Sequence, residues 1–197
     1  GGYLDMGNVN DKVFVSGDFN TSINYKHGIN GYSYLLKGVL DISGDLNDYY
    51  SHGNGNSTDY GLSSQGTKLV FSGNGNQTIT ATDGYLYFEN VEFKNPDITF
   101  KNTEISCYIE EDEIINGDLY ISDIDLKGHN LTVNGNLQLR NKIILNGGEL
   151  YINGDYNAAI PVTNSDGTTG YTGGYLDMGN VNDKVFVSGD FNTSINY

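Results

Sequence analysis

The chain has 197 residues, 37% hydrophobic residues and a formal net charge of −15. Its 27 Gly and 26 Asn residues favour turns and exclude a helical bundle, whereas the hydrophobic fraction can form a core and disfavours disorder. The negative charge repels nucleic acid phosphates and anionic membranes, so nucleic acid binding is excluded as a function.

The chain begins and ends with the same 25 residues, because residues 1–25 return without change as residues 173–197. Identity over this length indicates a recent tandem duplication. We therefore interpret residues 1–172 as one complete repeat unit and residues 173–197 as the start of the next identical unit, and we expect a longer natural array. The second copy has a net charge of −2, which leaves −13 on each 172-residue unit.

A short phrase recurs along the unit: two apolar residues at alternate positions, then Gly, then Asp or Asn. It occupies residues 13–19, 40–46, 70–74, 115–119, 131–137, 150–156 and 185–191. Its glycines are 18 and 19 residues apart between Gly117 and Gly154, which sets the period of one turn. The gaps of 44 residues before Gly117 and 35 residues after Gly154 predict two turns each, and earlier gaps of 27 and 29 predict single turns with a loop. We expect about eight turns per unit.

Residues 117–157 show what one turn contains. Apolar residues pair at positions i and i+2 about every six residues, namely Leu119/Ile121, Ile124/Leu126, Leu131/Val133, Leu137/Leu139, Ile143/Leu145 and Leu150/Ile152. Alternation with period two predicts strands. Three short strands per turn of about 18–19 residues predict an all-β fold, a parallel β-helix (β-solenoid) whose turns place like residues over like. A right-handed coil is favoured.

The predicted bends carry Asn-Gly and Gly-Asp pairs, as in residues 116–118 and 134–136. Such residues accept positive φ at low cost. The same pairs also form hairpins, so a meander of antiparallel hairpins is the competing architecture. In a solenoid, the asparagines of successive bends would form ladders of side-chain hydrogen bonds.

Three segments resemble repeat units of very large surface proteins of Gram-positive bacteria, mainly clostridia and their relatives. They are residues 126–139, 144–157 and 174–191, and residues 68–80 resemble a further segment of the same family. The shared phrases are Asn-Gly-Gly-x-Leu from Asn146, Tyr-Leu-x-Met from Tyr175 and Asn-Asp-x-Val-x-Val-x-Gly-Asp-Phe from Asn182. The resemblance implies an extracellular, wall-associated or filament-forming protein at the cell surface, and it brings no catalytic residues.

We therefore expect a non-enzymatic, structural repeat of a long extracellular bacterial stalk or filament. Its partners would be the adjacent identical repeats of the same chain. No run reaches the roughly 18 to 20 consecutive apolar residues of a membrane span, so we expect no span in this segment.

An enzyme acting on acidic polysaccharide is a third alternative, since parallel β-helices also carry sugar-acting enzymes on their outer face. Asp123 and Asp125 share a face, with Lys127 next on it. A single carboxylate pair without a second site in register is a poor acid/base arrangement. We interpret these residues as solvated, outward-facing side chains.

Oxygen-rich loops are candidates for a structural calcium ion, which prefers several hard oxygen ligands. The candidate ligands are Asp59, Asp112 and Asp166. Asp112 belongs to the acidic run 110–113, which we otherwise interpret as a solvated loop. No other cofactor is expected, because the three histidines lack partners at zinc-ligand spacing. The single cysteine, Cys107, excludes an internal disulfide framework and is interpreted as a small core residue.

Tyrosines gather in the segments that lengthen the turns. The candidates for ligand contact are Tyr32, Tyr34, Tyr49, Tyr50 and Tyr60. Tyrosine combines an apolar ring with a polar hydroxyl group, which suits sugars and protein partners. The alternative is that tyrosines of neighbouring turns stabilise the sheet. An adhesin that binds polysaccharide or a neighbouring filament through the loops 27–34, 49–64 and 158–171 is therefore the second functional hypothesis.

Overall fold

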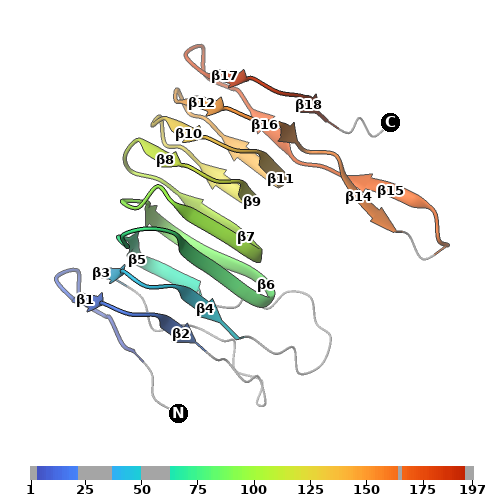
Figure 1. The fold of residues 1–197 in the computed structure, drawn as a ribbon. Coiled ribbons are helices and arrows are strands. Elements are labelled where there is room, and N and C mark those ends of the chain that lie inside the picture. The colour runs from blue at the N-terminus through green and yellow to red at the C-terminus, as the bar shows by residue number, and fades with distance from the viewer. Residues whose placement is uncertain (1–3, 22–36, 50–62, 164–165, 194–197) are drawn as a thin grey trace.

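The computed structural model describes residues 4–21, 37–49, 63–163 and 166–193. These ranges form eighteen strands and no helix, and the strands follow one another as the turns of a coil (Figure 1). The strands are β1 (Lys12–Val15), β2 (Phe19–Thr21), β3 (Val39–Ile42), β4 (Leu46–Asp48), β5 (Ser63–Phe71), β6 (Gln77–Glu92), β7 (Ile98–Tyr108), β8 (Glu113–Ile115), β9 (Leu119–Asp125), β10 (Leu131–Val133), β11 (Leu137–Ile144), β12 (Glu149–Ile152), β13 (Tyr156–Asn157), β14 (Ile160–Thr163), β15 (Thr169–Thr172), β16 (Tyr175–Asp177), β17 (Lys184–Val187) and β18 (Phe191–Asn192).

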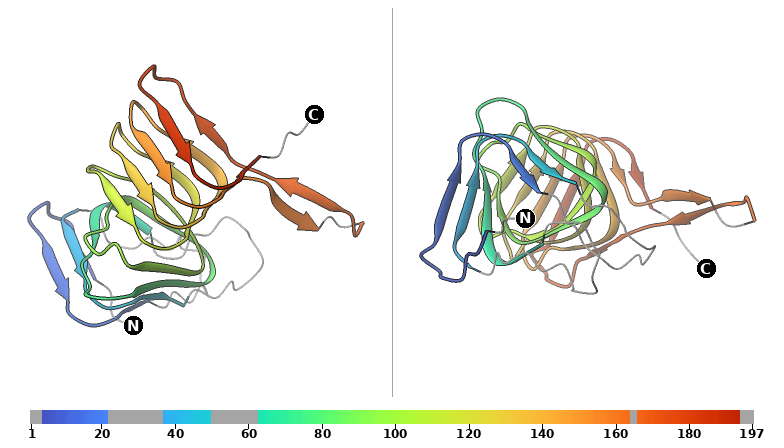
Figure 2. Two further views of the ribbon diagram at one scale, coloured as in Figure 1. Left: turned by 45° about the horizontal axis from the view of Figure 1, so that its top comes forward. Right: turned by 90° about the horizontal axis from the view of Figure 1, so that it is seen from below.

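The coil is a parallel β-solenoid, which confirms the predicted fold class. Each strand of the coil pairs in parallel with its counterpart in the next turn, as β1 does with β3 and β10 with β12. The long strands β5, β6 and β7 bend around the coil, so they pair in parallel with their neighbours in sequence. One face contains β1, β3, β5 and the end of β6, followed by β8, β10, β12 and β17. A second face begins with β2 and β4 and ends with β13 and β18, and a third ends with β16 on β11. Viewed along the axis, the turns lie over one another around a common interior (Figure 2).

The long step from Gly73 to Gly117 contains two turns, as predicted. The end of β6 takes the place of the missing phrase, since it pairs with β5 in register. The Asn95 N–H donates to the Phe71 carbonyl oxygen at 2.8 Å, which continues the stack at the bend. Asn95 and Pro96 therefore occupy a bend that elsewhere carries the glycine phrase.

The step from Gly154 to Gly189 contains one turn, and here the prediction of two was wrong. β17 pairs directly with β12, and β18 pairs directly with β13. The additional residues form the antiparallel hairpin β14–β15, which projects from the coil (Figure 1). The described strands therefore make seven turns per 172-residue unit instead of eight, with a rise of about 34 Å at about 4.8 Å per turn.

The interior is filled by the residues that point inward from each strand. All six apolar pairs predicted between residues 117 and 157 are buried. Larger rings fill the third and fourth turns, where Phe71 and Phe93 stack with ring centroids 5.7 Å apart. Cys107 is buried, as predicted, and desolvation raises the pKa of its thiol.

The bend glycines are required by the close stacking of turns. A Cβ atom on Gly135 would lie 2.6 Å from the Gly117 carbonyl oxygen, and one on Gly154 would lie 2.6 Å from that of Gly135. Positive φ occurs instead in the tight turns at Lys127-Gly128 and Asn146-Gly147. The prediction that the Asn-Gly-Asp bends use positive φ was wrong, because the glycines there leave room for the backbone of the next turn.

The predicted asparagine ladder runs up the bends. Asn153 donates from Nδ2 to Asn134 Oδ1 at 2.7 Å, and Asn134 donates in the same way to Asn116 at 2.8 Å. Asn116 donates to Asp97 Oδ1 at 2.7 Å. Each rung satisfies polar groups of two turns at once.

A second row of hydrogen bonds is made by the residues that directly follow the bend glycines. Here an Asp or Asn side chain accepts the backbone N–H of its counterpart in the next turn: Asp18 from Asp45, Asp118 from Asn136, Asn136 from Asp155, and Asp155 from Asp190. These acceptors satisfy backbone donors that a bend would otherwise leave without partners.

Candidate functional site

The place where one repeat unit meets the next is the candidate functional site. We call it the junction, and it consists of β16, β17 and β18 of the second copy resting on β11, β12 and β13. Glu149 pairs with Lys184 and Ile152 with Val187, with no shift of register between them. The β11–β16 and β13–β18 pairs are also parallel. The backbone ladder therefore passes from one unit to the next on all three faces.

Aromatic rings stack across the junction. Tyr151 and Phe186 lie with centroids 4.8 Å apart and 7° between ring planes, and Tyr156 and Phe191 lie 4.6 Å apart with 16° between planes. Tyr156 is fully buried, and desolvation raises the pKa of its hydroxyl group to about 12. The rings give the junction apolar contact area in addition to its backbone hydrogen bonds.

Two ion pairs flank the rings. Lys184 Nζ lies 2.5 Å from Glu149 Oε1, and Lys142 Nζ lies 3.0 Å from Asp177 Oδ2. Lys142 also lies 5.5 Å from the ring centroid of Tyr175. The hydrogen bond from Lys184 lowers the pKa of Glu149, and the hydrogen bond to Asp177 raises the pKa of Lys142. Opposite charges therefore face each other across the junction.

The two copies of the repeated segment show its two opposite edges. In the second copy, the Ser188 N–H donates to the Ile152 carbonyl oxygen of the turn below at 3.0 Å. In the first copy, the Val15 carbonyl oxygen accepts from the Ser43 N–H of the turn above at 2.9 Å. Among the described residues, β1 pairs only with β3 and β2 only with β4, so the lower edge of the first copy has no strand on it.

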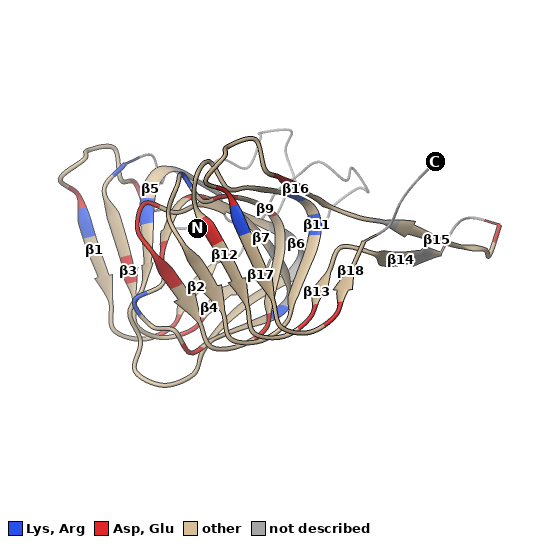
Figure 3. Cartoon of the chain, turned by 90° about the horizontal axis from the view of Figure 1, so that it is seen from above, with Lys and Arg blue, Asp and Glu red and all other residues tan. Residues whose placement is uncertain are grey.

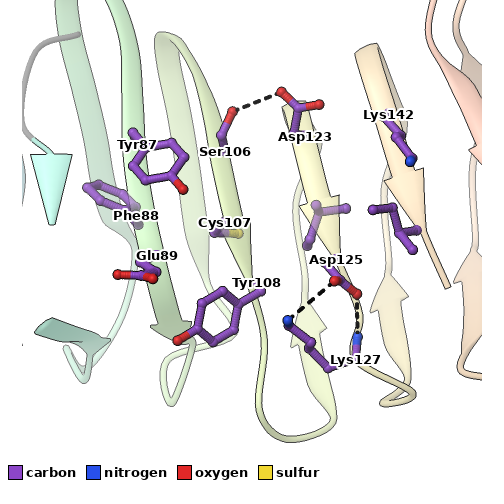
Figure 4. Close-up of a pocket in the computed structure, with 12 residues that line it drawn as sticks. Tyr87, Phe88, Glu89, Ser106, Cys107, Tyr108, Asp123, Asp125, Lys127 and Lys142 are labelled. Atoms are coloured by element: carbon purple, nitrogen blue, oxygen red, sulfur yellow. Dashed lines mark hydrogen bonds and ion pairs between the residues drawn. The ribbon is translucent and has the colours of Figure 1, made fainter. Parts of the chain in front are cut away.

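The outer surface of the third face carries a groove with a volume of about 180 Å³ (Figure 4). The polar residues that line it include Tyr87, Ser106, Tyr108, Asp123, Asp125 and Lys142. Tyr87 is 39% exposed. Lys127 lies 4.9 Å from the ring centroid of Tyr108, and its Nζ lies 3.5 Å from Asp125 Oδ2. Aromatic faces and hydrogen-bonding groups therefore line the same depression.

The two aspartates of the groove lie on the outer face, as predicted. Asp123 accepts from Ser106 Oγ at 3.3 Å and from Asn141 Nδ2 at 2.6 Å. Desolvation raises the pKa of Tyr108, and the negative charge of neighbouring glutamates raises it further. Sequence reasoning missed Tyr108 as a groove residue. Its position directly after the inward-facing Cys107 could have indicated an outward side chain.

Glu113 departs from the prediction that residues 110–113 form a solvated loop. The side chain of Glu113 is buried, whereas that of Ile114 is exposed. Glu113 pairs in register with Leu131 and takes the inward position of its turn. The recurring phrase could have predicted this burial, because Glu113 and Ile115 occupy the two inward-facing positions of the phrase that ends at Gly117.

The buried carboxylate of Glu113 joins two turns where the sheet changes. Its Oε2 accepts the backbone N–H of Phe93 at 3.0 Å, while its Oε1 has no hydrogen bond within the described part of the chain. Desolvation, together with the negative charges of Glu111 and Glu92, raises the pKa of Glu113 to about 7, although the hydrogen bond from the Phe93 N–H acts in the opposite direction. Glu113 thus links the fourth turn to β8, the first strand of a separate four-stranded sheet.

The calcium candidates are not brought together in the described ranges. Asp112 accepts from the Asn130 N–H at 2.8 Å, and Asp166 accepts from the Thr168 N–H at 2.9 Å. Asp59 lies outside the described residues. No group of three or more His, Cys, Asp or Glu side chains that could hold a metal ion occurs in residues 4–21, 37–49, 63–163 and 166–193. Calcium binding stays a prediction.

Of the tyrosines predicted to contact a ligand, only Tyr49 can be placed. It follows β4 and is exposed. The others lie outside the described residues: Tyr32, Tyr34, Tyr50 and Tyr60. The third predicted loop, residues 158–171, is largely the hairpin β14–β15.

Acidic residues are distributed along the whole stack and outnumber basic ones (Figure 3). No helix long and apolar enough to cross a bilayer occurs in the described part of the chain. Comparison of the sequence and the structure with protein-family models, with curated proteins and with solved structures gave no match.

Proposed function

We propose that the chain is a structural, non-enzymatic segment of an extracellular bacterial stalk or filament. In this role, identical 172-residue units stack end to end along one polypeptide at the cell surface. The partners of each unit are the units before and after it. The resemblance of residues 144–157 and 174–191 to repeats of large surface proteins of Gram-positive bacteria supports the location.

The observation that carries the proposal is the junction. The second copy sits on the seventh turn through parallel pairing on three faces and two stacked ring pairs. The segment that begins a unit is therefore shaped to rest on the segment that ends one. A stack of this kind resists bending because each turn is hydrogen-bonded to both neighbours.

The experiment is to express chains of one, two and four units, each followed by residues 173–197, and to measure particle length by electron microscopy. We expect straight rods that lengthen by about 34 Å for each added unit. Rods that bend at regular intervals, or compact particles whose length does not rise with unit number, would contradict the proposal.

A second candidate function, adhesion to polysaccharide, is favoured by the groove on the third face. Tyr87 and Tyr108 present ring surface beside the carboxylates of Asp123 and Asp125. Sugars bind to such surfaces through ring stacking and through hydroxyl groups that donate to carboxylates. The groove occurs once per unit, so an array would present many copies, and weak binding at each would add up.

A glycan array probed with the 197-residue chain tests this second function. We expect a sugar signal that falls at least tenfold in Tyr87→Ala and Tyr108→Ala, while Phe14→Ala, which removes an exposed ring outside the groove, retains it. The adhesin hypothesis fails if no glycan binds, and the groove is the wrong site if the two groove variants bind as well as the parent.

A further inference from the structure

We infer that the groove of the third face continues across the junction, so that a neutral, linear polysaccharide binds along the axis of the coil and contacts two repeat units at once. The far end of the binding site is then formed by Tyr175 and Asp177, which belong to the start of the next unit. This inference rests on the second candidate function, adhesion, and adds to it the direction and the chemical class of the ligand.

The groove and the junction share two columns of side chains that run parallel to the axis. The first column consists of residues paired in parallel from turn to turn, namely Tyr87, Ser106, Asp123, Lys142 and Tyr175. The second column is built in the same way from Tyr108, Asp125, Ile144 and Asp177. Figure 4 shows the first four residues of the first column on successive strands. Both columns therefore pass from the groove onto β16.

Lys142 lies in the groove and in the junction at the same time. It is one of the residues that line the groove. Its Nζ atom lies 3.0 Å from Asp177 Oδ2 and 5.5 Å from the ring centroid of Tyr175. Because one side chain contacts both surfaces, the wall of the groove continues from one unit into the next.

The same grouping of lysine, tyrosine and aspartate occurs at both ends of this surface. In the groove, Lys127 Nζ lies 4.9 Å from the ring centroid of Tyr108 and 3.5 Å from Asp125 Oδ2. Lys142 makes the equivalent contacts at the junction. Tyr108 and Tyr175 are three turns apart, which corresponds to about 14 Å along the axis. An extended oligosaccharide parallel to the axis can therefore contact both rings.

The charges favour a neutral ligand. The charged residues that line the groove are Glu89, Asp123, Asp125, Lys127 and Lys142. Each of the two lysines lies beside a carboxylate, so neither offers an unpaired positive charge to an acidic sugar. An acidic polysaccharide would meet like charges, which oppose binding. The hydroxyl groups of a neutral sugar can donate to the carboxylates while its ring faces pack on tyrosine.

The repeated segment supplies a matched pair of variants. Asp177 and Asp5 are the same residue in the two copies, but Asp5 does not line the groove. Asp177→Ala removes the ion pair with Lys142 and should weaken binding, whereas Asp5→Ala should not. Lys184→Ala is a second control, because it removes an ion pair of the junction on the face of β12 and β17, away from the groove.

The measurement is isothermal titration calorimetry of the 197-residue chain with hexasaccharides of glucose, mannose, galactose and galacturonic acid. Far-UV circular dichroism checks that each variant is folded. We expect the parent to bind at least one of the neutral hexasaccharides and not the galacturonic acid hexasaccharide. Tyr175→Ala and Asp177→Ala should each raise the Kd by about fivefold or more, whereas Asp5→Ala and Lys184→Ala should leave it unchanged.

Three results would overturn the inference and leave adhesion through the groove standing. They are binding of the acidic hexasaccharide alone, parental affinity in both Tyr175→Ala and Asp177→Ala, and an equal loss in Lys184→Ala, which would trace the effect to a loosened junction. If none of the four hexasaccharides binds the parent, the inference fails, and a silent glycan array would then remove the adhesin hypothesis as well. The rod-length test involves no ligand, so it decides the structural proposal separately.

Discussion

The two copies of the 25-residue segment have one sequence and two environments. Met6 is 1% exposed in the first copy, whereas its equivalent, Met178, is 49% exposed in the second. Phe14 and Phe186 differ in the opposite direction, because Phe186 has a turn beneath it and Phe14 does not. The first copy is covered from above and the second from below.

This difference shows that the segment receives its burial from its neighbours. Neither copy buries all its apolar groups, because each has a turn on one side only in the described structure. In a stacked protein, stability is approximately the sum of each turn and its contacts with adjacent turns. The end turns are therefore expected to open more easily than the interior turns.

The largest effect should come from filling the space between two turns. Gly154→Val would place side-chain atoms against the Gly135 carbonyl oxygen, and we expect it to destabilise the upper turns by about 4 kcal/mol or more. Gly17→Val, at the equivalent bend of the first copy, should change stability by less than about 0.5 kcal/mol. Urea unfolding followed by circular dichroism compares the two. Equal losses would mean that the bends tolerate or reject side chains irrespective of stacking.

The methionines test the comparison directly. Met6→Ala should cost about 2 to 5 kcal/mol, because it removes a fully buried side chain. Met178→Ala should cost less than about 1 kcal/mol in the same chain, since half of that side chain is exposed. In a chain extended by a further unit, the second substitution should become as costly as the first. If it does not, the added unit does not continue the stack.

A change of pH should act on the interior and spare both copies. The pKa of Glu113 is about 7 in the folded chain, above the ordinary value of 4.5, so the folded state holds its proton to higher pH than the unfolded state. Its contribution is therefore most favourable below about pH 4.5 and is lost as the pH rises through 7, by about 3 kcal/mol at most. Its counterparts in the two copies are Val13 and Val185, which carry no charge.

The measurement is the free energy of unfolding of the parent and of Glu113→Gln between pH 4.5 and 8. The parent should lose stability relative to the variant across this range. Glu149→Gln serves as the control, because the pKa of Glu149 is lowered, so its contribution is present above about pH 4.5 and should not be lost as the pH rises to 8. A difference between parent and Glu113→Gln that does not vary with pH would show that Glu113 does not titrate in this window.

The smallest effect should come from the lysine at the start of each copy. Lys184→Ala removes an exposed ion pair with Glu149 and should lower the melting temperature by about 1 °C or less, with no effect left in high salt. Lys12→Ala should have no measurable effect. A larger loss from Lys184→Ala that persists in high salt would indicate that its side chain contributes packing as well as charge.

The regular part of the coil could be predicted because its turns carry little besides strands and bends. Apolar pairs recur about every six residues between Leu119 and Ile152, and all of them are buried. The count failed after Gly154, where an inserted hairpin has the alternation and length of two coil strands. Periodicity predicts where strands form but not which strand each one pairs with. Only the antiparallel pairing of β14 with β15 shows that this segment is a hairpin and not a turn of the coil.

The candidate site was predictable only in part. The duplication of residues 1–25 indicated a junction, but the ring stack of Tyr151 on Phe186 depends on a register that the sequence does not specify. Glu113 was missed for a different reason. A glutamate beside three other acidic residues is usually solvated. Glu113 is buried because the alternation of side chains along β8 turns it inward, although the acidic composition of the segment favours a solvated loop.

The projecting hairpin β14–β15 has a consequence for the scale of an assembled fibre. Its sequence belongs to the 172-residue unit, so each further unit of a tandem array would carry one hairpin at the same turn. A chain of many units would therefore carry a protrusion at each interval of about 34 Å, measured out by seven layers of backbone. The axial spacing of these protrusions would therefore be set by the number of turns stacked in one unit.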